Sequence, residues 1–230
     1  MDTKVFRLLL TISFLFLAES VFSQEWIPIQ EKTQGAPVEM RILNDDASSY
    51  QVEVTINGIL NQEVNLKQGI FNQLSLGTYG SLLASGEPVL PLISRLIAVP
   101  SGTKASVSIE EGQWTDIKIG TIFPAQISSR DTKVHKSFYK NEKTYKAPYR
   151  PKIISLGEEQ TWRNIKNVTV SVCPFRYYPN ENRLSVLSKF VLRVNFEPIS
   201  RQANILTSSV KEEKCKLFDN TIYSSANRTK

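Results

Sequence analysis

Apolar residues stand at every second position in several short stretches of the chain, the clearest being Val52 to Ile56, Ala105 to Ile109, Val168 to Val172 and Phe190 to Phe196. Successive side chains of a strand point to opposite faces of a sheet, so this period of two predicts strands with one buried and one solvated face. About ten short strands of this kind, separated by turn residues, predict an all-β fold, an antiparallel β-sandwich.

Turn residues suggest how some of these strands are joined. Asn57-Gly58 follows the first alternating stretch and precedes the run Ile59 to Leu66. Both residues tolerate positive φ, so the pair predicts a type I′ hairpin turn. In the same way, Pro179 to Asn182 predicts the turn of a hairpin between Phe175–Tyr178 and Leu184–Leu187.

Three regions break the alternation. Gly77 to Pro91 is rich in Gly, Ser and Pro, and Ile127 to Pro151 is polar, basic and aromatic. The length of the second region indicates a functional or mobile loop. After Pro198 the chain becomes polar, so we expect a β-sandwich domain over residues 24–200 and a tail or linker over 201–230.

The N-terminus has the features of a secretory signal peptide. Lys4 and Arg7 precede an apolar run from Leu8 to Ala18, and Val21-Phe22-Ser23 offers compact residues for cleavage after Ser23. The run is shorter than the roughly 20 apolar residues that cross a bilayer, so no transmembrane segment is expected. Residues 1–23 therefore predict export to the periplasm, the cell surface or the medium.

Composition is that of a globular protein, but charge is unevenly spread. Hydrophobic residues make up 41% and charged residues 22% of the chain, and the net charge is +6. Eight basic and two acidic residues lie between Arg130 and Lys152, so this stretch holds the whole excess of positive charge. Because export makes a nucleic-acid partner unexpected, the alternatives are an acidic protein surface, an anionic glycan, a protease cleft or a simply solvated loop.

Residue types for catalysis are scarce. His135 is the one histidine, and neither Cys173 nor Cys215 has the setting of a held nucleophile. One histidine and two distant cysteines do not make a zinc site, and no phosphate-binding glycine loop is present. We therefore expect a chain without enzymatic activity, cofactor or metal, in which one disulfide pairing is possible and unpaired cysteines are the simpler expectation.

A family resemblance appears at Gly86-Glu87-Pro88-Val89-Leu90-Pro91, which runs into an apolar stretch ending at Ala98-Val99. This G-x-P-x-L-P block resembles the propeptide of gingipain-type cysteine peptidases, peptidase family C25. Further similar blocks follow in the same order: Lys143–Tyr145, Asn167–Phe175, Leu184–Val194 and Phe218–Tyr223. The resemblance covers nearly all of the predicted mature chain, and Gly86, Pro88, Leu90 and Pro91 are expected to serve the structure.

The resemblance implies a function for the whole domain. Such propeptides are β-sandwich domains that assist folding of a secreted cysteine peptidase and keep it latent by covering its active-site cleft. The implied partner is the catalytic domain of a C25 peptidase, in cis or in trans. By position, Arg130 is expected to point to the cleft, with Lys133, Lys136 and Tyr139 beside it, and Arg228 and Lys230 are expected processing sites.

Two alternatives stay open, because the expected catalytic domain is not in these 230 residues. In the first alternative, the chain is the N-terminal part of a cysteine endopeptidase precursor. In the second, it is a non-inhibitory surface or adhesion module that binds an anionic glycan or protein through the basic loop.

Overall fold

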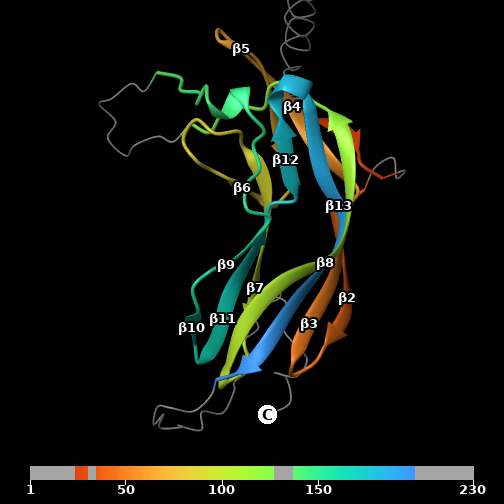
Figure 1. Ribbon diagram of the computed structural model, residues 1–230, viewed down its shortest axis with the longest axis vertical. Coiled ribbons are helices and arrows are strands. Elements are labelled where there is room, and N and C mark those ends of the chain that lie inside the picture. The colour runs from red at the N-terminus through yellow and green to blue at the C-terminus, as the bar shows by residue number, and fades with distance from the viewer. Residues whose placement is uncertain (1–23, 31–34, 127–136, 200–230) are drawn as a thin grey trace, which may run out of the picture.

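The computed structural model describes residues 24–30, 35–126 and 137–199. This part of the chain forms strands and two single-turn 3-10 helices, η1 (Thr144–Lys146) and η2 (Pro179–Glu181). The strands lie in antiparallel sheets that stack along an elongated body (Figure 1). The predicted all-β class is confirmed.

One five-stranded sheet is built around β13 (Arg183–Pro198). Along one edge β13 pairs with β8 (Thr103–Lys118). Along its other edge it pairs first with β12 (Phe175–Tyr178) and then with β3 (Ser49–Ile56), and β2 (Val38–Asp45) lies outside β3. The long β13 therefore links the two ends of the body.

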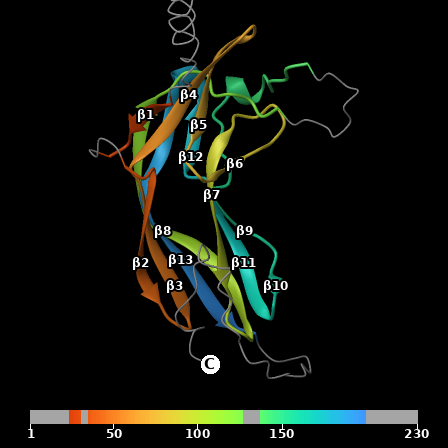
Figure 2. The same cartoon turned by 180° about the vertical axis from the view of Figure 1, so that it is seen from behind.

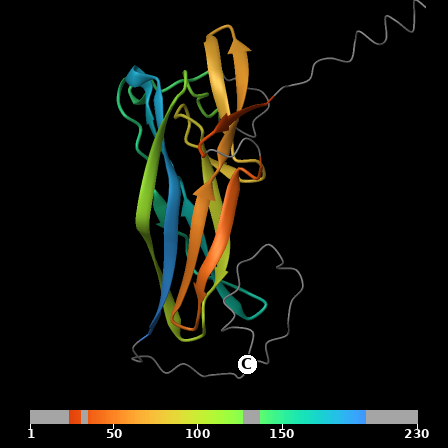
Figure 3. The same cartoon turned by 90° about the vertical axis from the view of Figure 1, so that its right-hand side faces the viewer.

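The remaining strands form a facing sheet and a small end sheet. In the facing sheet, β11 (Ile165–Val172) lies between β7 (Leu90–Ala98) and the short strands β9 and β10, and β6 lies beyond β7. These three short strands are Gly80–Leu82 (β6), Ile154–Leu156 (β9) and Gln160–Trp162 (β10). The end sheet consists of β1 (Glu25–Pro28), β4 (Gly58–Leu66) and β5 (Gly69–Ser75) (Figure 2). The β4–β5 hairpin projects from one end of the body (Figure 3).

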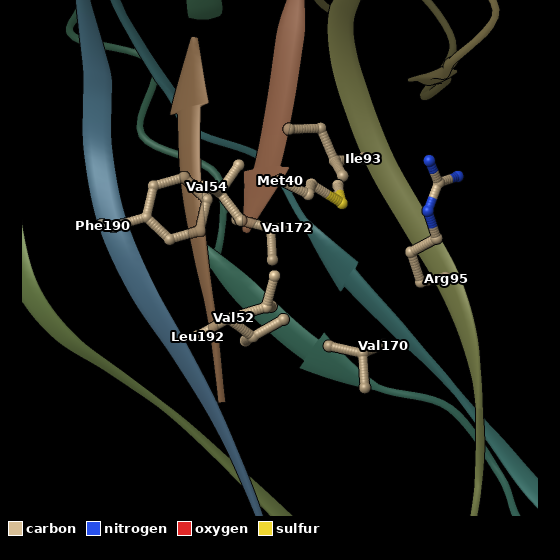
Figure 4. Close-up of a pocket in the computed structure, with 9 residues that line it drawn as sticks. All are labelled: Met40, Val52, Val54, Ile93, Arg95, Val170, Val172, Phe190 and Leu192. Atoms are coloured by element: carbon tan, nitrogen blue, oxygen red, sulfur yellow. The ribbon is translucent and has the colours of Figure 1, made fainter. Parts of the chain in front are cut away.

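The core lies between the two five-stranded sheets, as the alternation predicts. The apolar residues of the first, third and fourth series are buried, with exposures of 6% or less: Val52, Val54, Ile56, Val168, Val170, Val172, Phe190, Leu192, Val194 and Phe196. A cavity of about 10 Å³ lies between the sheets, and Figure 4 shows its mainly apolar walls. This volume holds a single water at most.

The prediction of a hairpin at Asn57-Gly58 is wrong. β3 and β4 do not pair, because the chain passes from one sheet to another at this point. Asn57 is buried and its side-chain amide donates to the Ala36 carbonyl at 3.0 Å. Gly58 begins β4 opposite Pro28, and a Cβ there would lie 2.2 Å from the Trp26 ring. Glycine is thus needed for the close approach of an aromatic ring, and not for a turn.

The strands are longer than the pattern indicated. The hairpin of β12 and β13 around η2 is confirmed, but β13 continues through Ser188 to Pro198. Ser188 interrupts the apolar series, yet it is fully buried and its hydroxyl donates to the Gln113 carbonyl at 3.1 Å. A register shift beside Ser188 accommodates the irregularity without ending the strand.

Candidate functional site: the strap and its base

Residues 137–152, which we call the strap, cross one end of the body (green to teal in Figure 1). They form the second half of the region expected to be a loop. The structure shows that this half is packed onto the body by aromatic side chains and backbone hydrogen bonds. The strap is therefore irregular, as expected of a loop, but it is packed onto the body.

The strap begins with an aromatic cluster. The Phe138 ring lies with its centroid 5.3 Å from that of Phe71 in β5 and 6.3 Å from that of Phe123. Phe71 and Phe123 contact each other edge-on at 6.0 Å. Such aromatic pairs contribute about 0.5–1.5 kcal/mol beyond the area they bury, so Phe138 attaches the start of the strap to the end sheet.

Tyr145 anchors the middle of the strap. It is 8% exposed, and its hydroxyl donates to the Ile122 carbonyl at 2.7 Å. Its ring meets that of Tyr177 edge-on at 6.2 Å. Burial raises the pKa of Tyr145 well above its usual range, so the hydroxyl stays neutral and acts as a donor.

Tyr149 anchors the far part of the strap through its backbone. It exchanges two hydrogen bonds with Tyr177 of β12, at 2.8 and 2.9 Å. Burial also raises the pKa of Tyr149, to about 12. The guanidinium of the neighbouring Arg150 lies 5.2 Å from the Tyr178 ring, which fastens this end to β12.

The G-x-P-x-L-P motif lies directly under the strap. Gly86 has φ of +74°, and a Cβ at this position would lie 2.4 Å from the Tyr139 ring. The Gly86 carbonyl accepts from the Asn141 backbone at 2.9 Å, and the Asn141 side chain donates to Glu87 at 2.6 Å. Glycine is thus required here both for the backbone conformation and for the ring above it.

The motif also pairs with the segment that precedes residue 127. The Gly86 amide donates to the Ala125 carbonyl at 2.9 Å, and the Ala125 amide donates to the Glu87 carbonyl at 2.8 Å. Pro88 faces Pro124 in an isolated antiparallel bridge. The motif therefore lies between the two chain segments that flank residues 127–136, while Leu90 and Pro91 begin β7 beside it.

The basic side chains of the strap face outward. Lys140 pairs with Glu142 at 3.2 Å and lies 5.3 Å from the Tyr145 ring centroid. The other basic residues of the strap, all exposed, are Lys143, Lys146, Arg150 and Lys152. The buried aromatic rings thus hold a positively charged outer surface at this end of the molecule.

The structure places only some of the predicted site residues. Tyr139 is 52% exposed and packs against Gly86. The others lie outside the described residues: Ser23, Arg130, Lys133, His135, Lys136, Cys215, Arg228 and Lys230.

Cys173 lies buried as a free thiol with 1% exposure, and burial raises its pKa to about 12. A thiol in this state is not a nucleophile at neutral pH.

The sequence did not single out Gln126 or Asn141, which tie the strap to the body. Isolated amide residues in a polar stretch carry no recognisable signal. Within the described ranges, no group of His, Cys, Asp and Glu could hold a metal ion, and no helix is long and apolar enough to cross a membrane.

The molecule is an all-β domain whose strap packs on the G-x-P-x-L-P motif. Comparison with known proteins identifies its family. The model of the C25 propeptide family, Propeptide_C25, matches residues 30–225. The chain therefore belongs to the C25 propeptide family.

Individual relatives are distant in sequence. Gingipain R2 of Porphyromonas gingivalis is 20% identical over 169 residues, which are 72% of this chain and 23% of that protein. The chain thus matches less than a quarter of the curated relative's length.

Two solved structures share the fold. One, on the zymogenic latency of gingipain K from Porphyromonas gingivalis, superposes with a TM-score of 0.67 at 18% identity and covers 77% of this chain and all of that chain. The other, the complex of the Porphyromonas gingivalis RgpB pro- and mature domains, gives 0.61 at 18% identity and covers 76% and 93%.

Proposed function

We propose that this chain is an exported pro-domain that binds the catalytic domain of a C25-type cysteine peptidase, keeps it latent and assists its folding. The family match over residues 30–225 is the observation that carries this proposal. A similar fold occurs in a gingipain whose zymogenic latency was studied and in a pro-domain in complex with its mature domain. The domain itself supplies no chemistry, in keeping with the buried, neutral thiol of Cys173.

The strap end of the molecule is the proposed contact surface. Here the strap carries the exposed Lys143, Lys146 and Arg150, and in the sequence it follows residues 127–136, which contain Arg130. Arg130 enters an acidic specificity pocket of the peptidase, where a guanidinium can bind a carboxylate through two parallel hydrogen bonds. Lys133, Lys136 and Tyr139 contact the rim of the cleft.

Processing completes the proposal. Signal peptidase removes residues 1–23, and the peptidase cuts the tail at Arg228 or Lys230 once it is active. The sandwich over 24–200 and the tail over 201–230 act on the catalytic domain in cis in a longer precursor, or in trans as a separate chain.

Inhibition is the direct test. Residues 24–230 are titrated against an arginine-specific C25 peptidase, and inhibition is expected at or below micromolar concentration. Arg130→Ala should weaken inhibition 10-fold or more, since the lost charge-assisted contact is worth about 1.5–3 kcal/mol. Lys104→Ala, an exposed basic residue outside the strap, is the matched control and should inhibit like the wild type. No inhibition by the wild type would refute the proposal.

A second candidate is supported by the exposed basic residues of the strap. It is a surface or adhesion module that binds an anionic glycan or protein by charge. Such binding would weaken steeply with salt, because exposed charges are screened within about 8 Å at physiological ionic strength. Binding to a sulfated polysaccharide that is unchanged between 50 and 500 mM salt, or absent, would rule it out.

A further inference from the structure

The outer face of the sheet around β13 carries two guanidinium groups that lie against aromatic rings. The guanidinium carbon of Arg176 in β12 lies 4.1 Å from the centroid of the Trp114 ring in β8. That of Arg150 in the strap lies 5.2 Å from the centroid of the Tyr178 ring. A cation within about 6 Å of a ring centroid is attracted to the ring, so each ring holds its guanidinium group in place.

Strand register places both groups on the same side of the sheet. Arg176 and Tyr178 flank the buried Tyr177 in β12, and neighbours along a strand point to opposite faces. Tyr149 of the strap pairs with Tyr177 in an antiparallel bridge. Arg150, the next residue, therefore lies on the same outer face as Arg176. Figure 3 shows this face of the sheet turned toward the viewer.

A third arginine on this face is paired within the domain. Arg183 of β13 also lies over the Tyr178 ring, with 3.8 Å to its centroid. Its guanidinium group forms ion pairs with Asp116 at 3.0 Å and with Glu181 at 2.7 Å. Two carboxylates of the domain therefore take up its charge and its donors.

Arg150 and Arg176 differ from Arg183 in this respect. Among the residues that the structure describes, neither has a carboxylate or another hydrogen-bond acceptor. Arg150 is exposed and Arg176 is half-buried, so solvent reaches both. A guanidinium group offers five N–H donors and no acceptor, and its planar fork matches a carboxylate. The rings thus present two oriented cations whose donors are open to a partner.

We propose that Arg150 and Arg176 bind carboxylate side chains on the surface of the catalytic domain of the C25 peptidase. This inference rests on the proposed function. Arginine, tryptophan and tyrosine carry much of the binding energy at protein interfaces, and this face combines all three. A guanidinium group already held by a ring loses little freedom on pairing, which lowers the ordering cost of association. Because Arg150 belongs to the strap, this face continues the proposed contact surface.

Methionine at these positions removes the charge and keeps much of the packing. Arg150→Met and Arg176→Met each leave an unbranched side chain that still covers its ring. Arg193→Met is the matched control. Arg193 lies on the same outer face toward the other end of β13, and it is already paired with Glu110 at 2.7 Å.

Two measurements on residues 24–230 test the contact. The first is the inhibition constant against an arginine-specific C25 peptidase. The second is the dissociation constant for the same peptidase after alkylation of its catalytic cysteine, which reports binding without turnover. The double variant Arg150→Met/Arg176→Met should weaken both about 10-fold or more, and each single variant less, since charge-assisted hydrogen bonds are lost. Arg193→Met should match the wild type in both, and the thermal midpoint of the double variant should match that of Arg193→Met.

The outcomes separate the contact from the proposed function. If the wild type inhibits and the double variant binds and inhibits equally well, the contact is overturned while the proposed function stands. If the wild type binds the alkylated peptidase but does not inhibit the active one, the proposed latency fails. Loss of that binding in the double variant would then support the contact, and its persistence would overturn it. If the wild type neither binds nor inhibits, both fail.

Two further results bear on the contact itself. A double variant that inhibits like the wild type but no longer binds a sulfated polysaccharide would assign this face to a glycan and overturn the proposal. If the double variant has a lower thermal midpoint than the control, Arg150→Met alone decides by the same two readouts, because its side chain is exposed. Wild-type values for that variant would overturn the proposal.

Discussion

The sandwich and the strap are held by different kinds of contact. In the sandwich, β13 pairs with three other strands, and its apolar face packs against residues from the opposite sheet. In the strap, residues 137–152 contain no strand, and single contacts from Phe138, Tyr145 and Tyr149 fix its course. Stability is therefore shared over many residues in the sandwich and concentrated in a few in the strap. A change in the first should unfold the domain, while a change in the second should release one segment.

The largest expected effect is in the sandwich core. Phe190→Ala removes a ring that is 1% exposed between the two sheets, so unfolding should become easier by about 3–5 kcal/mol. Phe138→Ala removes a ring of the same size from the strap and should cost less than about 2 kcal/mol. Urea unfolding of both variants measures the difference. Equal losses would contradict the division into two regions.

Gly86→Ala should release the strap and lower the free energy of unfolding by less than Phe190→Ala does. An alanine at φ of +74° costs roughly 1–2 kcal/mol, and its Cβ would displace the Tyr139 ring. Hydrogen exchange of the Asn141 amide, which donates to the Gly86 carbonyl, should therefore become faster.

Gly102→Ala is a matched control for this variant. Gly102 has the same φ of +74°, but no atom lies within 4 Å of its added Cβ. It therefore carries the backbone strain alone and should leave the exchange of Asn141 unchanged. If Gly102→Ala accelerates that exchange as much as Gly86→Ala, the ring contact has no separate role.

The smallest expected effect is at Tyr145 and depends on pH. Tyr145→Phe leaves the Ile122 carbonyl without its donor and should lower the free energy of unfolding by about 1–2 kcal/mol at pH 7. Burial raises the folded-state pKa of Tyr145 above the value near 10 of an unfolded tyrosine. The unfolded wild type therefore loses this proton above about pH 10 while the folded state keeps it, so the wild type loses stability as pH rises.

Phenylalanine has no such proton, so the stability gap between the wild type and Tyr145→Phe should shrink above about pH 10. Urea unfolding at several pH values from 7 to 11 measures this gap. A gap that is constant or grows over this range would show that the hydroxyl is not buried in the folded state.

The strap shows why sequence reasoning succeeded for the sandwich and missed part of the strap. Its alternating basic and aromatic residues suggested a solvated binding loop, yet Tyr145 and Tyr149 face the body, whereas most of the basic side chains face outward. Periodicity gives no guidance where the backbone is irregular, so the orientation of each ring depends on partners such as Ile122 and Tyr177 that lie far away in the sequence.

The sequence by itself determined the all-β class, the buried faces of β3, β11 and β13, and the family. These follow from local alternation and from an ordered set of motifs, which need no knowledge of distant contacts. Only the tertiary structure decided that β3 and β4 belong to different sheets, that Ser188 does not end β13, and that Gly86 lies beneath Tyr139. Each of these depends on side chains brought together from separate segments, because close packing and hydrogen bonding at such sites override local turn and strand preferences.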